Sequence, residues 1–189
     1  MTGQYEVTFA GFGGQGIMLA GQVLAYAGIA EGKNAVWLPS YGPEMRGGTA
    51  YCTVVISDKR IGSPIINSPR AVCVFNPPSF EKFVPRVRAG GLALVNSSLI
   101  SFLNERTDIT EIRIPANDLA LEAGTVKVTN IVVLGAFVAA SEVVKYDTLV
   151  SVVKEKLGKK KELLEVNMRV LDKGYQFALD ALAKKGSRV

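Results

Sequence analysis

A glycine-rich run at residues 11–16 constrains this chain most, because it lies between an apolar strand-like stretch and a helix-like stretch. The run contains Gly11, Gly13, Gly14 and Gly16, with Gln15 as its polar member. Glycines at such a junction permit a tight turn and let the backbone approach a ligand closely, while the first N–H groups of the helix face an anion. The run therefore predicts a strand–turn–helix start.

The acidic residue that should accompany a nucleotide-binding turn is missing. In dinucleotide-binding proteins an acid about 20 residues further on holds the ribose. The second predicted strand covers residues 35–38, and Pro39 and Ser40 stand where that acid is required. The sequence therefore argues against ordinary NAD binding. From these residues alone, a tight junction without a ligand is slightly favoured.

Apolar strand-like runs alternate with helical patterns along the chain. This alternation predicts one α/β domain over residues 1–189, with an open, mostly parallel sheet, helices on both faces and a helical last third. Apolar residues alternate with other residues from 49 to 57, which predicts an antiparallel strand there. The strands are expected at 5–9, 35–38, 49–57, 71–75, 92–95 and 111–114, and the helices at 17–32, 79–87, 118–122, 130–144, 148–157 and 161–184.

A second loop, residues 39–48, concentrates prolines and glycines directly after a predicted strand. Such residues shape a rigid arch, which presents Glu44 and Arg46. Arg46 could hold a carboxylate or phosphate through two hydrogen bonds. A simple ion pair between Glu44 and a neighbouring cation, or with Arg46 itself, is an equally good interpretation. Ligands gather at the carboxyl ends of parallel strands, where both loops are expected.

The composition excludes several kinds of chemistry. The chain has no histidine, so it lacks the commonest general base and metal ligand and any Ser-His or Cys-His pair. Its two cysteines, Cys52 and Cys73, lie in apolar runs without CxxC spacing. We therefore expect two buried thiols, with no metal site, iron–sulfur site or disulfide.

Charge and hydropathy give expectations about partners and location. The net charge of +5 comes in good part from lysines near the ends of late predicted helices, at residues 159–161 and 184–185. Without aromatic platforms, these lysines indicate solvated helix ends rather than a nucleic-acid site. No stretch has the roughly 18 apolar residues of a membrane span, and residues 1–6 lack the signal-peptide pattern. We expect a cytoplasmic protein with no membrane partner.

Several motifs, in the same order, resemble the gamma subunits of the 2-oxoacid:ferredoxin oxidoreductases. Within this family the second loop looks most like that of the 2-oxoglutarate enzyme, while the pyruvate and branched-chain enzymes are close alternatives. The indolepyruvate enzyme carries a histidine in this loop and fits less well. The motifs are Gly11-Phe-Gly-Gly-Gln-Gly16, Ser40-Tyr-Gly-Pro-Glu-Met-Arg-Gly-Gly48, Val55-Ile-Ser-Asp58, Ile61-Gly-Ser-Pro64, Gly90-Gly91, Asn96-Ser97-Ser98 and Asn130 to Ala136.

The resemblance implies a Rossmann-like gamma domain in a complex that converts 2-oxoglutarate, coenzyme A (CoA) and oxidised ferredoxin into succinyl-CoA, CO2 and reduced ferredoxin. The holoenzyme uses thiamine diphosphate, Mg²⁺ and iron–sulfur clusters. This sequence lacks the four cysteines of a cluster and the Gly-Asp-Gly plus Asn pattern of a thiamine site. The resemblance therefore implies that these cofactors belong to alpha, beta and ferredoxin-like partner subunits, and that this chain alone is inactive.

The resemblance also implies roles for the two loops, none of them catalytic in the proton-transfer sense. Arg46 is expected to contact an anion of the substrate or of CoA, or a partner acid, and Glu44 to orient Arg46 or bond across an interface. Tyr41, Gly47 and Gly48 complete this loop. The glycine turn would offer the Gln15 side chain and helix N–H groups to a polar partner. Two further expectations are a homodimer of the isolated chain and, as an alternative function, a free-standing nucleotide-binding α/β protein.

Overall fold

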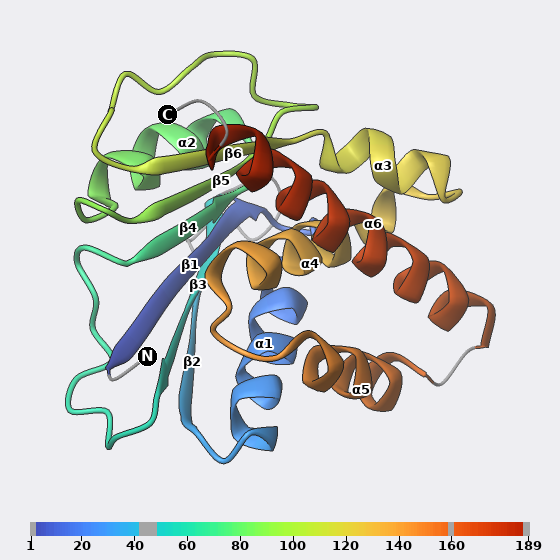
Figure 1. Ribbon diagram of the computed structural model, residues 1–189, viewed down its shortest axis with the longest axis horizontal. Coiled ribbons are helices and arrows are strands. Elements are labelled where there is room, and N and C mark those ends of the chain that lie inside the picture. The colour runs from blue at the N-terminus through green and yellow to red at the C-terminus, as the bar shows by residue number, and fades with distance from the viewer. Residues whose placement is uncertain (1–2, 42–48, 159–160, 187–189) are drawn as a thin grey trace.

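Strands and helices alternate along the chain as the sequence predicts (Figure 1). The computed structural model describes residues 3–41, 49–158 and 161–186. Every predicted element is present, and the differences lie at element ends. The bounds are β1 Gln4–Phe12, α1 Ile17–Ala30, β2 Asn34–Tyr41, β3 Thr49–Ser57, β4 Ala71–Val74, α2 Pro77–Phe83, η1 Val84–Arg86, β5 Leu92–Asn96, β6 Thr110–Ile114, α3 Ala116–Glu122, η2 Val126–Val128, α4 Thr129–Ser141, α5 Tyr146–Leu157 and α6 Lys161–Gly186.

Three predicted helices end earlier than expected. The first, α1, ends at Ala30, and the other two end for local reasons. The helix expected at 79–87 is α2 followed by the 3₁₀ turn η1, because Pro85 cannot continue the α-helical hydrogen-bond pattern. The helix expected to reach residue 144 ends at Ser141, and Glu142 follows in the left-handed conformation with φ 50°. Such a residue typically ends a helix.

The described residues form a six-stranded sheet in the order β2-β3-β1-β4-β5-β6. The strands β1, β4, β5 and β6 pair in parallel, which is the predicted arrangement. The strand β3 pairs antiparallel to both β1 and β2. This is the antiparallel strand that the alternation from 49 to 57 predicts. Because β3 is antiparallel to both of its neighbours, β2 runs parallel to β1.

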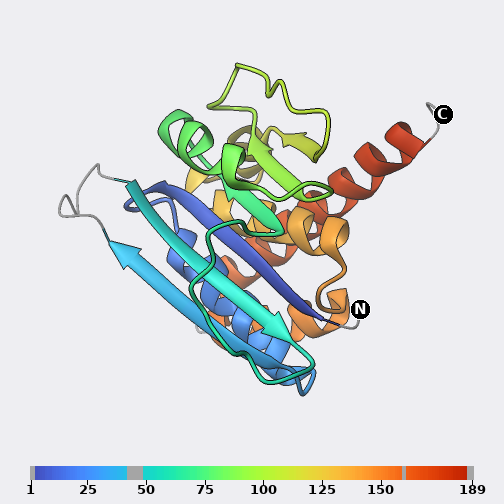
Figure 2. The same ribbon diagram turned by 90° about the vertical axis from the view of Figure 1, so that its left-hand side faces the viewer.

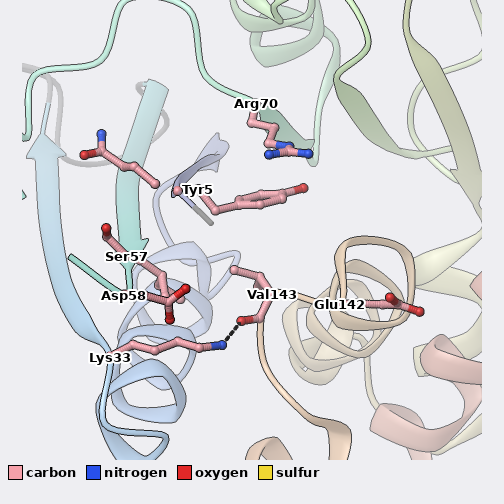
Figure 3. Close-up of a pocket in the computed structure, with 10 residues that line it drawn as sticks. Tyr5, Lys33, Ser57, Asp58, Arg70, Glu142 and Val143 are labelled. Atoms are coloured by element: carbon pink, nitrogen blue, oxygen red, sulfur yellow. Dashed lines mark hydrogen bonds between the residues drawn. The ribbon is translucent and has the colours of Figure 1, made fainter. Parts of the chain in front are cut away.

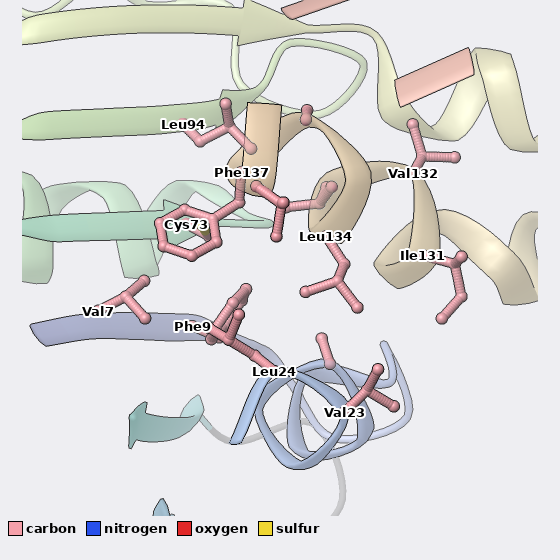
Figure 4. Close-up of a cluster of buried hydrophobic side chains, with 14 of the residues drawn as sticks. Val7, Phe9, Val23, Leu24, Cys73, Leu94, Ile131, Val132, Leu134 and Phe137 are labelled. Atoms are coloured by element: carbon pink, nitrogen blue, oxygen red, sulfur yellow. The ribbon is translucent and has the colours of Figure 1, made fainter. Parts of the chain in front are cut away.

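Helices cover both faces of the sheet, as predicted, but unequally (Figures 1 and 2). The larger core packs α1, α4, α5 and α6 against one face, and the smaller core packs α2 and η1 against the other. Phe9 and Phe137 meet edge to face at the centre of the larger core, with ring centroids 5.7 Å apart (Figure 4). Ala50, Cys52, Val54 and Ile56 face this core, as their alternation predicts.

The helices α4 and α6 cross at two glycines. A Cβ added at Gly135 would lie 2.2 Å from the carbonyl oxygen of Leu171, and one at Gly174 would lie 2.0 Å from that of Val132. Both positions therefore accept only glycine at this helix separation. The close crossing fixes α4 between the sheet and α6. The start of α4 therefore lies at the side of the sheet where the parallel strands end, which we call the carboxyl edge.

Candidate functional site

The two predicted loops meet at the carboxyl edge of the sheet. Gly11 on β1 pairs with Ala50 on β3, and Ala50 pairs with Tyr41 on β2. The glycine turn after β1 and the loop after β2 therefore begin at the same edge, on either side of the start of β3, as predicted. The backbone of Tyr41 ends β2, whereas Glu44, Arg46, Gly47 and Gly48 lie outside the described residues. Their predicted roles are thus untested by the structure.

The glycine turn requires glycine at two positions. Gly14 has φ 95° and Gly16 has φ 74°, in the left-handed region that other residues rarely adopt. The turn is closed by a hydrogen bond from the Gln15 amide to the Phe12 carbonyl, 3.2 Å long. Gly16 is the N-cap of α1, and no side chain caps the helix. The first N–H groups of α1 thus have no side-chain acceptor at the cap.

Gly11 and Gln15 differ in part from their predicted roles. Gly11 is the buried penultimate residue of strand β1 rather than part of the turn, and a Cβ there would lie 2.9 Å from Cβ of Phe75. The Oε1 atom of Gln15 accepts hydrogen bonds from the Phe12 amide at 2.7 Å and from Nδ2 of Asn76 at 3.3 Å. The side-chain oxygen of Gln15 therefore holds the turn together, and the Nε2 group of the same side chain is left to bind a partner.

Asn130 connects the start of α4 to the start of α1. Its Nδ2 group donates a hydrogen bond of 3.0 Å to the carbonyl oxygen of Gly16. A Cβ at Gly16 would lie 2.6 Å from this same nitrogen. Gly16 is therefore required both for its backbone conformation and for the space that Asn130 occupies.

Asparagines follow two neighbouring parallel strands at the same edge. Asn76 follows β4 and its Oδ1 atom caps α2 by accepting from the Ser79 amide at 3.0 Å. Asn96 ends β5, accepts from the Ala116 amide at 3.2 Å and donates to Asn117 at 3.0 Å. Asn76 and Asn96 are each only 1% exposed, so these hydrogen bonds satisfy groups that water cannot reach.

These amides form a polar layer under the edge that the sequence analysis did not describe. Asn76 was not predicted, and Asn96 and Asn130 were noted only within motifs. For Asn76 the available signal is an asparagine between an apolar strand and a helix start, which is the sequence position of an N-cap. The layer fixes where the following helices begin, and so gives the edge a rigid base.

The described residues do not provide a reactive thiol or a metal centre. Burial raises the pKa of Cys52 to about 12 and that of Cys73 well above its usual value. A cluster needs several cysteine ligands, but these two lie on separate strands in the core, and no group of three metal-ligating side chains was found among the described residues. An iron–sulfur cluster therefore does not fit this part of the chain. None of the helices described here is long and apolar enough to cross a membrane.

Comparison with known proteins identifies the family. Residues 6–177 match the pyruvate ferredoxin/flavodoxin oxidoreductase family. The chain belongs to this family. The 2-oxoglutarate synthase subunit KorC of Methanocaldococcus jannaschii is 35% identical, over 92% of this chain and 93% of KorC. The ketoisovalerate oxidoreductase subunit VorA of Methanothermobacter marburgensis is also 35% identical, over 93% of this chain.

The length of KorC and a solved structure agree with a gamma-type subunit of this oxidoreductase family. The chain spans only 37% of the length of VorA, but almost the whole of KorC. The structure of a keto/oxoacid ferredoxin oxidoreductase gamma subunit from Geobacter sulfurreducens PCA is 32% identical, with a TM-score of 0.82 over 93% of this chain and 99% of that subunit. The predicted fold and the predicted family are thus both confirmed.

Proposed function

We propose that this chain is the gamma subunit of an enzyme that converts 2-oxoglutarate, CoA and oxidised ferredoxin into succinyl-CoA, CO2 and reduced ferredoxin. The end-to-end match with KorC carries this proposal, because a subunit of the same length is named there for 2-oxoglutarate. A branched-chain 2-oxoacid is the second candidate, since VorA has the same identity of 35%. Pyruvate is a third.

The proposed role of the chain is to complete an interface and enclose an active site whose cofactors other subunits hold. The holoenzyme cofactors would be thiamine diphosphate, Mg²⁺ and iron–sulfur clusters, and they supply carbon–carbon cleavage and one-electron transfer. The partners would be an alpha subunit, a beta subunit and a ferredoxin-like subunit, with ferredoxin as the electron acceptor. This complex would be cytoplasmic.

The carboxyl edge is the proposed contact surface for this role. The start of α1 without a side-chain cap and the Gln15 Nε2 group can both donate hydrogen bonds to a carboxylate, phosphate or partner carbonyl. The amide layer of Asn76, Asn96 and Asn130 holds these groups in place. In this proposal Arg46 supplies the charge that selects an anion, and Glu44 orients Arg46.

The test is anaerobic purification of the tagged chain from its native host, followed by CoA-dependent reduction of a viologen dye. We expect thiamine- and cluster-bearing partners to co-purify and 2-oxoglutarate to give the highest kcat/KM. Higher kcat/KM with a branched-chain 2-oxoacid or pyruvate would overturn the substrate assignment but not the family. If the chain is purified alone and binds NAD or ATP, the free-standing nucleotide-binding alternative would replace the proposal.

The contribution of Arg46 can be tested in the same complex. We expect Arg46→Gln to reduce kcat/KM for the 2-oxoacid or for CoA by about tenfold or more. A loss of this size corresponds to the free energy of one charge-assisted hydrogen bond. Arg60→Gln changes an exposed arginine of another loop and serves as the control. Equal activity of both variants, with subunits still assembled, would refute a role for Arg46 in binding an anion.

A further inference from the structure

A cavity of about 420 Å³ lies at the amino edge of the sheet, opposite the edge that carries the glycine turn. It lies beside the start of β1, the end of β3 and the turn after α4 (Figure 3). A second cavity of about 190 Å³ shares Tyr5 and Arg70 with the first. These two side chains therefore face both spaces.

Arg70 is a half-buried cation held in place by stacking. Its guanidinium carbon lies 5.0 Å from the centre of the Tyr5 ring. It forms no ion pair and no side-chain hydrogen bond with any residue that the structure describes. Arg106 and Arg113, by contrast, bind both carboxylates and backbone carbonyls. The Tyr5 ring thus positions Arg70, and the N–H donors of this arginine are available to bind an anion.

The Tyr5 hydroxyl provides a second donor next to Arg70. Figure 3 shows the guanidinium and the hydroxyl at the same end of the stacked pair. Tyr5 is 6% exposed, and burial raises the pKa of its phenol, so the group keeps its proton and can donate. Within the described part of the chain, this hydroxyl has no hydrogen-bond partner.

Backbone groups around the smaller cavity are already used. The amides of Gly90, Gly91, Leu92 and Thr110 donate to the carbonyls of Asp108, Arg88, Arg70 and Gly91 respectively. The wall therefore offers the side chains of Arg70 and Tyr5 rather than a nest of backbone N–H groups. An arginine can bind a carboxylate or a phosphate through two hydrogen bonds, but many phosphate sites also use such a nest. One guanidinium and one hydroxyl without a nest match the two oxygens of a carboxylate better.

Among the described residues, the other charged side chains that line the two cavities do not form ion pairs with Arg70. Lys33 is already occupied, since its Nζ atom donates to Glu31 at 2.8 Å and to the Val143 carbonyl at 2.7 Å. Asp58 and Glu142 line the larger cavity but are exposed, so solvent and salt screen their repulsion of an anion. In Figure 3 the Glu142 carboxylate points away from Tyr5.

The geometry points to a binding site for a small carboxylate, with Arg70 pairing with both carboxylate oxygens and the Tyr5 hydroxyl donating to one of them. This site is separate from the carboxyl edge and does not depend on the proposed function. Two charge-assisted hydrogen bonds on a half-exposed surface correspond to a millimolar Kd.

The experiment is a titration of the full chain with acetate, succinate and inorganic phosphate at constant ionic strength, followed by amide ¹H–¹⁵N spectra. We expect saturable shifts near Tyr5, Arg70 and Gly91, and none at Gly14 and Gly16 on the opposite edge. Either carboxylate should bind more tightly than phosphate. Binding of phosphate as tight as that of the carboxylates would overturn the assignment to a carboxylate, and so would shifts that do not saturate.

Variants of the site give the decisive comparison. Arg70→Met keeps the side-chain stem but removes the donors, and it should weaken carboxylate binding about tenfold or more. Arg86→Met is the matched control, since Arg86 also lies over a ring, 5.8 Å from the centre of Phe83, but does not line either cavity. Equal binding by both variants would overturn the proposal.

Two further variants test the same site without removing Arg70. Tyr5→Phe keeps the ring and should weaken binding several-fold. Asp58→Asn removes a repelling charge and should tighten binding slightly. If Arg70→Met does not fold, Tyr5→Phe decides the matter, because unchanged binding by this variant would contradict the proposed pairing.

Discussion

Replacing Gly16 by alanine separates backbone strain from a specific steric conflict. Gly16 and Gly32 both have φ 74°, so an alanine at either position is strained by about 1–2 kcal/mol. Nothing lies within 4 Å of a Cβ at Gly32, whereas a Cβ at Gly16 would lie 2.6 Å from Nδ2 of Asn130, and ordinary contact begins at 3.4 Å. Gly32→Ala is therefore a control for the strain alone.

The additional cost at Gly16 follows from the hydrogen bond that Asn130 would lose. To make room, the Asn130 amide must leave the Gly16 carbonyl, to which it now donates at 3.0 Å. Asn130 is 2% exposed, so its displaced amide would lack a partner, at a cost of about 1–3 kcal/mol. We therefore expect Gly16→Ala to lower the free energy of unfolding by about 1–3 kcal/mol more than Gly32→Ala.

Urea unfolding followed by the fluorescence of Trp37, the single tryptophan, measures this difference. A double-mutant cycle with Asn130→Ala provides the internal check, because removing the Asn130 side chain relieves the conflict at Gly16. We expect a coupling free energy of about 1–2 kcal/mol between the two positions. Equal destabilisation by Gly16→Ala and Gly32→Ala, or no coupling with Asn130→Ala, would refute the reasoning.

Three further outcomes follow from the packing and from the pKa shifts. Gly174→Ala should lower the free energy of unfolding by about 1–3 kcal/mol, measured by urea unfolding, since its Cβ would lie 2.0 Å from the Val132 carbonyl oxygen. Both cysteines should react with a thiol reagent only after unfolding, because each is fully buried; reaction in the native state would contradict this. Burial raises the pKa of Glu31, but hydrogen bonds from Lys33 and a backbone amide outweigh it and leave the pKa low. Glu31→Gln should thus reduce stability at pH 7, and urea midpoints should converge with the wild type as the pH falls below the usual pKa of 4.5; a constant difference would exclude this ion pair as the cause.

Local patterns in the sequence were sufficient to predict the elements of the fold. The alternation from 49 to 57 predicted β3 and the four apolar residues that share one of its faces, and the structure shows that this face meets the larger core. The glycines at 14 and 16 predicted the turn before α1, and the structure shows that both adopt a positive φ there. Such features depend on neighbouring residues only, so the sequence can reveal them without knowledge of what packs around them.

Tertiary structure alone decided which distant residues meet. The hydrogen bond between Asn130 and Gly16 joins residues 114 positions apart, and no local pattern indicates it. The helix α4 is apolar on all sides, so its periodicity could not say which face meets the sheet and which meets α6. Arg70 lies over Tyr5 because β4 pairs with β1, and only that pairing forms the amino-edge cavity. The sequence determined the helices and strands through local backbone preferences. Long-range packing decided which residues meet at the carboxyl edge and at the amino edge of the sheet.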